Sequence, residues 1–435
     1  MDELRRGAGI VSNGGSNLGD ATDALRLCQG NALEVILELD IQDLSNGPSI
    51  YALREAIEWN TTLRNVHITL HGLLEDINER DRATFGSIVE AAASLPDLKR
   101  LVLASQFIPM PAITSVLQCA RGLLKIELRH FKNLSSFERD KRAAFCESLR
   151  HHPTLRSFSF HPFINHYVPQ EHLFMSLLFG ALVEIPTLRK VCIESNSTSL
   201  SGGPLVDLCS ANLIRLRVDV QGEIAVDAVR AASKNRHIQE LLMSCGSTDN
   251  YTAVLTDLIE QNQTLTKLTL IYHEGLSSED HVVQIARALR GNTTLVRVSI
   301  QPGDLSISVL ETFVETARCN FSLHSLNVFD DENMIKKITL QEIEHTKDKE
   351  EKAALMLGKK IEFYTMLNRS GRGILLGNKK LSKAQWTDKL GEVSYILDCL
   401  FFFLQVNPTL CCSGQSHSPE NPGRPQHKYA RKESH

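Results

Sequence analysis

The chain has 435 residues and a net charge of −4, from 47 basic and 51 acidic side chains. Hydrophobic residues make up 42% of it and charged residues 23%. Both values are close to the averages for globular proteins, so the chain is able to form a buried core and is not disordered throughout. The slightly acidic balance argues against a protein dedicated to binding nucleic acid, and we expect no nucleic-acid partner.

Residues 1–22 are rich in Gly, Asn and Ser, and we expect them to be disordered or a loose cap. They carry no apolar stretch of the kind that a secretory signal needs. The ten cysteines form no C-x-x-C pair, which excludes the common zinc-ribbon and thioredoxin-type motifs. The most apolar run, 396–406, is shorter than the roughly 20 residues of a membrane-spanning helix. These features predict a cytoplasmic protein without a membrane partner.

A short phrase recurs within residues 23–331 and predicts a repeat domain there. Clear copies lie at 60–68, 262–270 and 292–300, and their shared core is L-x-x-L-x-L with aliphatic or aromatic substitutes. Ten intervals separate the first of eleven copies from the last, which gives a spacing of about 29 residues, as in stacked repeat architectures. The copies start at Ala32, Leu63, Leu98, Leu123, Leu155, Leu188, Leu213, Ile238, Leu265, Leu295 and Leu323.

Each unit is predicted to contain one strand and one helix. Apolar residues alternate within the phrases, as at Val66 and Ile68, which is the period of a β-strand. Between phrases they fall at helical spacing, as at Ile50, Leu53 and Ile57. An asparagine often precedes the phrase by three positions, and we expect it to end the helix because Asn tolerates the left-handed backbone conformation. These residues are Asn60, Asn235, Asn262, Asn292 and Asn320.

The eleven phrases resemble the ribonuclease-inhibitor-like class of leucine-rich repeats over roughly residues 31–331. The resemblance implies an α/β solenoid, or horseshoe, of about eleven parallel strands with helices on the convex side. The family often has Asn or Cys three residues after the last Leu of the phrase, whereas among ten such positions here only Asn196 is Asn, and Phe131 is one of the exceptions. We therefore expect irregular loops after the strands. Ribonuclease inhibitors proper are far richer in cysteine, so that activity is not expected.

Residues 332–412 interrupt the repeat and predict an α-helical C-terminal cap. One helix is expected around 355–367, and a second after a capping box at Ser382 and Gln385. The second helix should present an apolar seam that includes Trp386, Leu397 and Leu404. Two antiparallel helices of this kind would cover the last repeat, as a solenoid requires. The phrase at 362–372 resembles a flank that follows such repeats in uncharacterised algal proteins, which implies no function.

Other motifs carry little chemistry. Residues 413–435 lack an apolar pattern and predict a disordered tail. Three glycines at 371–377 lack the G-K-[ST] of a phosphate loop, which favours a turn between helices. The histidines between 151 and 172 match no known ligand spacing, which favours surface histidines over a metal site.

No catalytic signature appears, so we expect no enzyme and no cofactor. Lipidation of Cys411 and Cys412 stays an open alternative.

The exposed face of the predicted strands carries a basic column. The third residue of each phrase points away from the core, and six of these eleven residues are basic. Neighbouring strands lie about 4.8 Å apart, so the side chains should align, with Glu127, Glu194 and Asp219 partly neutralising them. The alternative is that these cations only keep the sheet soluble. The predicted partner-binding residues are Arg100, Lys125, Arg129, Lys190, Arg215, Arg217, Lys267 and Arg297.

The sequence thus favours a non-catalytic scaffold or regulator, expected to be a monomer, whose concave face binds a protein with an acidic surface. Similar repeats occur in innate-immune-type receptors and Ran-GTPase activators, a resemblance that implies scaffolding, sensing or regulation. No nucleotide-binding domain accompanies these repeats, and the tail is basic where that of the activators is acidic. The alternatives are a GTPase-regulating repeat protein and a substrate-recruiting subunit of a ubiquitin ligase, for which the N-terminal segment is short.

Overall fold

The structure, a computed structural model, consists of two compact units, Met1–Thr365 and Met366–His435. The C-terminal tail from 407 onward, including Cys411 and Cys412, lies outside the residues that it describes. Those residues are 10–12, 22–23, 25, 33–72, 77–107, 109–131, 139–162, 169–195, 202–220, 226–244, 249–272, 279–301, 305–329, 343, 345–346, 348–373, 382–393 and 397–406.

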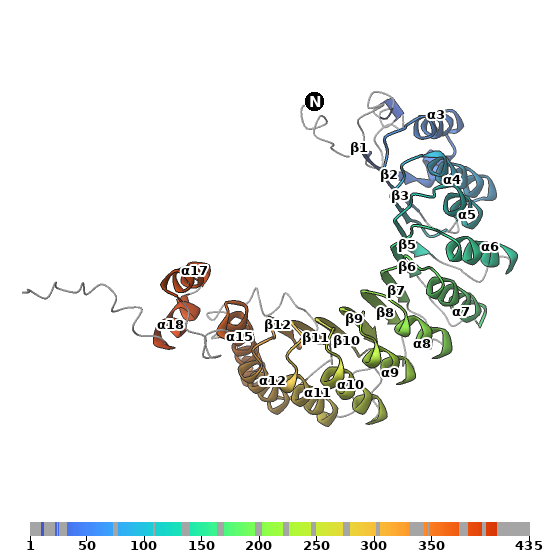
Figure 1. The fold of residues 1–435 in the computed structure, drawn as a ribbon. Coiled ribbons are helices and arrows are strands. Elements are labelled where there is room, and N and C mark those ends of the chain that lie inside the picture. Colours follow the sequence, from blue (N-terminus) through green and yellow to red (C-terminus); the bar gives the residue numbers. More distant parts are fainter. Residues whose placement is uncertain are drawn as a thin grey trace, which may run out of the picture. The chain divides into compact units, whose positions relative to one another are not determined.

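The first unit is built on one sheet of twelve parallel strands, whose order in the sheet is their order in the chain (Figure 1). The predicted α/β repeat solenoid is thereby confirmed, with the eleven expected strands as β2 to β12. The additional strand, β1, pairs with β2 and lies where the sequence predicts no regular structure. The strands are β1 (Ile10–Ser12), β2 (Glu34–Asp40), β3 (Asn65–His71), β4 (Arg100–Ala104), β5 (Lys125–Phe131), β6 (Ser157–Pro162), β7 (Lys190–Ser195), β8 (Arg215–Val220), β9 (Glu240–Ser244), β10 (Lys267–Ile271), β11 (Arg297–Gln301) and β12 (Ser325–Asn327).

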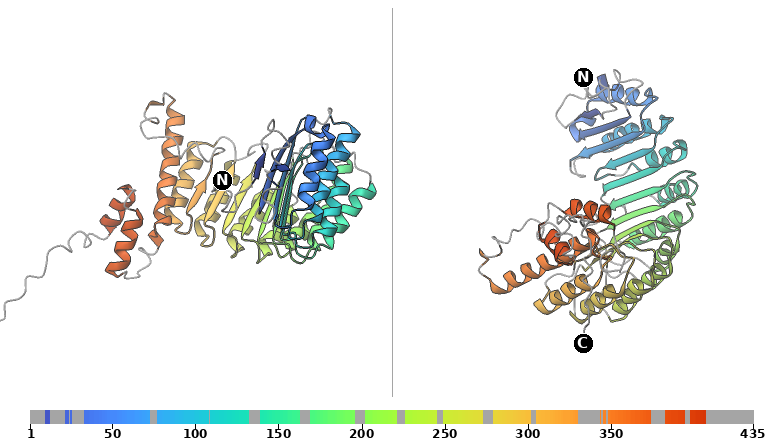
Figure 2. Two further views of the ribbon diagram at one scale, coloured as in Figure 1. Left: turned by 90° about the horizontal axis from the view of Figure 1, so that it is seen from above. Right: turned by 60° about the vertical axis from the view of Figure 1, so that its left-hand side comes forward.

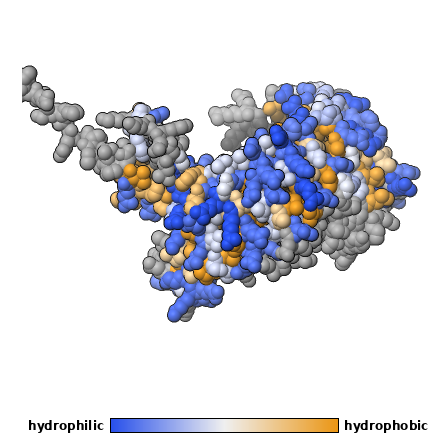
Figure 3. Space-filling model, turned by 60° about the horizontal axis from the view of Figure 1, so that its bottom comes forward, coloured by the Kyte–Doolittle hydropathy of each residue, from blue (hydrophilic) through white to orange (hydrophobic). Residues whose placement is uncertain are grey.

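Helices follow the strands and cover one side of this sheet. Figures 1 and 2 show them along the outer side of the arc of strands, and none of the described helices α2 to α12 lies on the inner side of the sheet. On the side seen in Figure 3, hydrophilic residues predominate and hydrophobic ones are scattered between them. The helices are α2 (Ile41–Leu44), α3 (Gly47–Glu58), α4 (Glu79–Ala91), the 3₁₀ helix η3 (Ala92–Ser94), α5 (Met110–Cys119), α6 (Arg139–Arg150), α7 (Pro169–Val183), α8 (Gly202–Ser210), α9 (Val226–Lys234), α10 (Asp249–Gln261), α11 (Glu279–Gly291) and α12 (Ile307–Cys319).

The leucines of the repeat phrase fill the space between sheet and helices. Leu63, Leu98, Leu155, Leu188 and Leu265 are each at most 2% exposed, as the periodicity predicts. Together with the alternate strand residues they belong to one continuous core. One unit cannot bury its own apolar face, so the stacking of neighbours provides this burial and holds the inner face of the sheet in place.

A bulge in β5 brings an unexpected residue into this core. His130 has a φ of 66°, and the pairing register with β6 shifts between Arg129 and Phe131. The extra residue turns the Phe131 side chain into the hydrophobic core, where it is fully buried and stacks on Phe160 with 6.4 Å between ring centroids. The expectation of irregular loops is therefore wrong at Phe131, and also at His71, which ends β3, whereas Gln106 lies beyond the end of β4. The loop positions Phe163, Asn196, Gln221, Gly246, His273, Gly303 and Asp331 lie outside the described residues.

The asparagines at the ends of the helices act through their side chains. Asn320, which follows α12, has φ −89° and ψ 121°, an extended conformation. Within the described ranges His130 is the non-glycine residue with a positive φ. The expectation that these asparagines end the helices in a left-handed backbone conformation is therefore wrong. Their role comes instead from a buried side-chain amide that forms hydrogen bonds with the backbone.

Asn262 shows the pattern. Its Oδ1 accepts hydrogen bonds from the backbone N–H groups of Thr264 and Leu265, at 2.9 and 2.8 Å, and so shapes the turn into β10. Its Nδ2 donates to the carbonyl of Asn235 in the preceding repeat, at 2.8 Å. One planar amide thus satisfies backbone groups of two successive units, which water cannot reach at this depth.

The same arrangement continues through four consecutive repeats, and we call Asn235, Asn262, Asn292 and Asn320 the asparagine ladder. The Nδ2 of each donates to carbonyls of the preceding unit, at distances that include 2.8 Å for Asn235, 2.6 Å for Asn292 and 2.6 Å for Asn320. All four are at most 8% exposed. The ladder therefore ties each of these repeats to the one before it.

His152 takes the place of asparagine in the repeat that leads into β6. It is 1% exposed, so the expectation of a surface histidine is wrong here. Its Nε2 lies 3.2 Å from the carbonyl of Ala120, and its Nδ1 accepts from the N–H of Thr154 at 3.4 Å. This geometry requires a neutral imidazole with the proton on Nε2. Burial lowers the pKa of His152, and the hydrogen bond to Ala120 only partly offsets this.

We expect His152 to weaken the fold in mild acid. Its folded pKa lies below the model-peptide value of 6.5, so protonation favours the unfolded chain, and stability present above pH 6.5 is lost as the pH falls below it. His152→Asn should remove this loss, which amounts to at most about 1.4 kcal/mol per pH unit. Urea unfolding of both proteins between about pH 5 and pH 8 checks this, and parallel pH profiles would contradict it.

The long helix α15 (Lys349–Arg369) continues the core past β12. Its Leu357 and Ile361 join the main core, and Leu355 packs with Ile343 beside Phe329. This packing is consistent with the first helix of the predicted cap, because the exposed apolar edge of a solenoid needs such a cover.

Among its described residues the second unit has two short helices, α17 (Lys383–Val393) and α18 (Leu397–Val406), where the sequence predicts one. The capping box is confirmed, since Ser382 and Gln385 exchange hydrogen bonds at 2.9 and 3.3 Å. Trp386 is buried as expected, but Leu397 is 64% exposed, so its place in the seam is wrong. The regular spacing of apolar residues in the sequence therefore does not form one continuous buried seam over both helices. No helix of the described residues is long and apolar enough to cross a membrane.

Candidate functional site

The third residues of the repeat phrases form one column across the inner face of the sheet. The pairing register places Arg100 beside Lys125, Lys190 beside Arg215, and Lys267 beside Arg297. Ser157 and Glu240 occupy the two positions between these pairs. Residues more than 20 positions apart in sequence are thus neighbours, as strand alternation predicts.

A hollow of about 420 Å³ lies on this face, along strands β5 to β10. Arg100, Arg129 and Arg297 are not part of its lining. The charged side chains that line it are Lys125, Lys190, Arg215, Arg217, Lys267, Glu127, Glu194 and Glu240. Five cations thus face three carboxylates, and the hollow carries an excess of two positive charges in a chain whose net charge is −4.

Glu127 partly neutralises three of the predicted binding cations. Its carboxylate lies 2.7 Å from Lys125 Nζ and 3.8 Å from Arg100 Nη2, and it also forms an ion pair with Arg129. Burial raises the pKa of Glu127, but the hydrogen bonds from Lys125 and Arg129 and the charges of these two residues together outweigh burial and bring the pKa to about 2. The carboxylate is therefore charged at neutral pH, and these three cations share an internal partner.

Two further predicted cations each have their own carboxylate. Arg215 Nε lies 2.5 Å from Glu240 Oε2, and Arg217 Nε lies 2.6 Å from Glu194 Oε1. Burial raises the pKa of Glu240, but the hydrogen bond from Arg215 and the positive charges of Arg215, Lys267 and Lys190 together outweigh burial and lower it. Both pairs lie on the surface of the sheet, where such pairs contribute little to stability.

Lys190, Lys267 and Arg297 differ from the other five. Their side chains are exposed, and none of the ion pairs between described residues involves them. Of the eight predicted binding cations, these three are therefore the ones whose positive charge is least neutralised by a neighbouring carboxylate.

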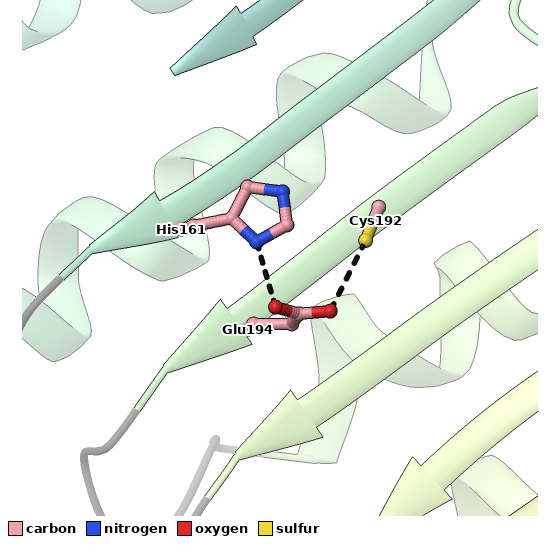
Figure 4. A group of neighbouring side chains, drawn as sticks. All are labelled: His161, Cys192 and Glu194. Atoms are coloured by element: carbon pink, nitrogen blue, oxygen red, sulfur yellow. Dashed lines mark hydrogen bonds and ion pairs between the residues drawn. The ribbon is translucent and has the colours of Figure 1, made fainter. Parts of the chain in front are cut away.

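The structure also brings together three side chains that the sequence did not connect (Figure 4). His161 Nδ1 lies 2.8 Å from Glu194 Oε2, and Cys192 Sγ lies 3.8 Å from Glu194 Oε1. Burial raises the pKa of the Cys192 thiol to about 12, and the charge of Glu194 adds to the effect. The hydrogen bond from His161 lowers the pKa of Glu194. All three line the hollow.

The positions of these three residues within their repeats could have indicated that they are neighbours. His161 and Glu194 are 33 residues apart, one repeat length, and so occupy the same place in successive strands. Cys192 lies two residues before Glu194 and therefore on the same face of β7. A search for ligand spacing along the chain misses such a group, because its members are neighbours across the sheet.

Neither a scan against models of protein families nor a search of curated proteins finds a match for this chain. The class of protein therefore follows from the fold. Repeated strand–helix units in one parallel sheet are consistent with a leucine-rich-repeat-like solenoid.

Proposed function

We propose that this protein is a non-catalytic scaffold or regulator of the ribonuclease-inhibitor-like class of leucine-rich repeats, which binds an acidic protein surface on the inner face of its sheet. The observation that carries the proposal is the aligned column of basic side chains, of which Lys190, Lys267 and Arg297 are exposed and outside the ion pairs of the described residues.

The distribution of charge supports an acidic partner. The hollow has an excess of cations although the whole chain is slightly acidic, so its sign is not a consequence of composition. Opposite charges speed association and select partners, and they act over a Debye length of about 8 Å at physiological ionic strength. The inner face of a curved solenoid also offers a partner a continuous, preformed surface.

The sharpest test reverses the three least compensated cations together. Lys190→Glu, Lys267→Glu and Arg297→Glu should slow association with the partner about tenfold or more and reduce its dependence on salt. The fold should not change, because the three side chains are exposed. A quantitative pull-down from native lysate with wild type and variant identifies proteins lost from the variant, and stopped-flow kinetics with the purified partner at several salt concentrations measures the effect.

A matched control makes the same change of charge on the helices. Lys234 of α9, Arg287 of α11 and Lys360 of α15 are exposed and outside the ion pairs between described residues. Their reversal to Glu should leave binding within about twofold of wild type, apart from the general effect of net charge. If both triple variants bind alike, the column serves solubility and another surface holds the partner.

A further inference from the structure

We propose that His161, Cys192 and Glu194 form a binding site for a divalent ion of the zinc type on the inner face of the sheet. One ligand atom from each residue lies within 4.8 Å of the others, and the three side chains converge in Figure 4. An imidazole nitrogen, a sulfur and a carboxylate oxygen are the ligands that zinc takes in proteins. The site does not depend on the proposed protein-binding role.

The sheet places the three ligands in advance. Phe160 of β6 pairs with Ile193 of β7, so the next residue on each strand, His161 and Glu194, projects to the inner face side by side. Cys192 is on the same face of β7, two residues earlier. Ligands on strands inside a twelve-stranded sheet lose little backbone freedom when an ion binds, which favours affinity.

The distances suit a tetrahedral ion after small adjustments. Bonds of about 2.0 to 2.3 Å place tetrahedral ligand atoms about 3.3 to 3.7 Å apart. Nδ1 of His161 and Oε2 of Glu194 are 2.8 Å apart, and Sγ of Cys192 lies 3.8 Å from Oε1. These two contacts are to different oxygens of Glu194, and with one ligand atom from each residue the three atoms lie within 4.8 Å of one another. Side-chain rotations that move them by about 1 Å produce the spacing that a zinc ion needs.

Arg217 is a positioning residue for this group. Its Nε lies 2.6 Å from Oε1 of Glu194, while Oε2 faces His161. Such outer contacts orient a ligating carboxylate. A dication with one thiolate and one carboxylate is neutral as a whole, so the guanidinium of Arg217 does not oppose binding through net charge.

The site has room for a fourth ligand. All three residues line the hollow of about 420 Å³, which leaves a coordination position for water or for a group of a bound partner. On binding, the thiol proton of Cys192 passes to solvent and the sulfur ligates as a thiolate, while His161 ligates as a neutral imidazole. The proton that Nδ1 of His161 donates to Glu194 moves through solvent to Nε2, so that Nδ1 offers its lone pair to the ion.

Cobalt(II) and zinc(II) titrations of the full chain test the proposal. We expect one cobalt ion per chain with a thiolate-to-cobalt charge-transfer band, displacement of cobalt by zinc, and proton release measured by calorimetry in two buffers. Cys192→Ser should abolish the band and weaken zinc binding about 100-fold or more, and Glu194→Gln should weaken it at least about tenfold. The exposed Cys119 is the matched control, and Cys119→Ser should change neither result.

The proposal is overturned if the wild type takes up no zinc at one ion per chain, or if Glu194→Gln and Cys192→Ser bind zinc as tightly as wild type. It is also overturned if the charge-transfer band disappears in Cys119→Ser. Circular dichroism shows whether each variant folds, and Glu194→Gln remains decisive if Cys192→Ser does not. Reversal of Lys190, Lys267 and Arg297 retains all three ligands, so a failure of the metal site and a failure of the protein-binding surface are distinguishable.

Discussion

Replacement of Phe160 by alanine should lower the free energy of unfolding by about 3–5 kcal/mol. Phe160 is 1% exposed in β6, and its ring lies among those of Phe131, Phe158 and Phe174, with centroid distances of 6.4, 6.3 and 6.1 Å. Removing it leaves a cavity that three aromatic neighbours on different elements cannot fill at once, because close-packed cores relax only partially.

Two variants bracket this result in urea unfolding followed by circular dichroism. Phe160→Leu keeps much of the volume and should lose only about 1–2 kcal/mol. Phe401→Ala removes a ring that is 62% exposed and should change stability by no more than about 0.5 kcal/mol. An equal, small loss for Phe160→Ala and Phe401→Ala would show that the four rings do not form a tightly packed centre.

Asn262→Ala should cost about 2–4 kcal/mol, because a buried amide satisfies several backbone groups at once. Without it the N–H groups of Thr264 and Leu265 and the carbonyl of Asn235 lose their partners at a depth where Asn262 is only 4% exposed. The midpoint of thermal or urea unfolding measures the loss.

Asn262→Asp separates the two halves of this amide. The carboxylate keeps an acceptor for the turn but places a charge against the carbonyl of Asn235, so we expect it to be at least as destabilising as alanine. Asn212→Ala is the control, since that asparagine is exposed, and it should change stability by less than about 0.5 kcal/mol. If both Asn262 variants were as stable as Asn212→Ala, the Asn262 amide of the ladder would contribute nothing to stability.

The sequence predicted the fold where its pattern repeats. Leucines such as Leu98 and Leu155 recur at one phase, so their burial, the parallel strands and the alignment of the basic column follow from counting residues. β1 escaped prediction because its three residues carry no copy of the phrase. The division into the separate helices α17 and α18 escaped prediction because the apolar steps from Trp386 to Leu404 are compatible with one continuous helix.

The candidate site was predictable only in part. Strand alternation gives the face on which Lys125 or Arg215 lies, but not which carboxylate it meets, because ion pairs depend on side-chain rotamers. The ion pairs that Arg100, Lys125 and Arg129 form with Glu127 can therefore be identified only from the structure.

The asparagine ladder also bears on how this array can change its length. Each of its amides accepts hydrogen bonds from its own unit through Oδ1 and donates to the previous unit through Nδ2, as Asn262 shows. Excision of residues 262–291 would bring Asn292 to the place of Asn262 and lay β11 against β9, with Arg297 beside Glu240. Duplication between the same boundaries would lengthen the chain in the same way. Growth and loss by whole units thus keep the amides of the ladder paired, whereas loss of Asn262 alone leaves backbone groups of two units without their partner.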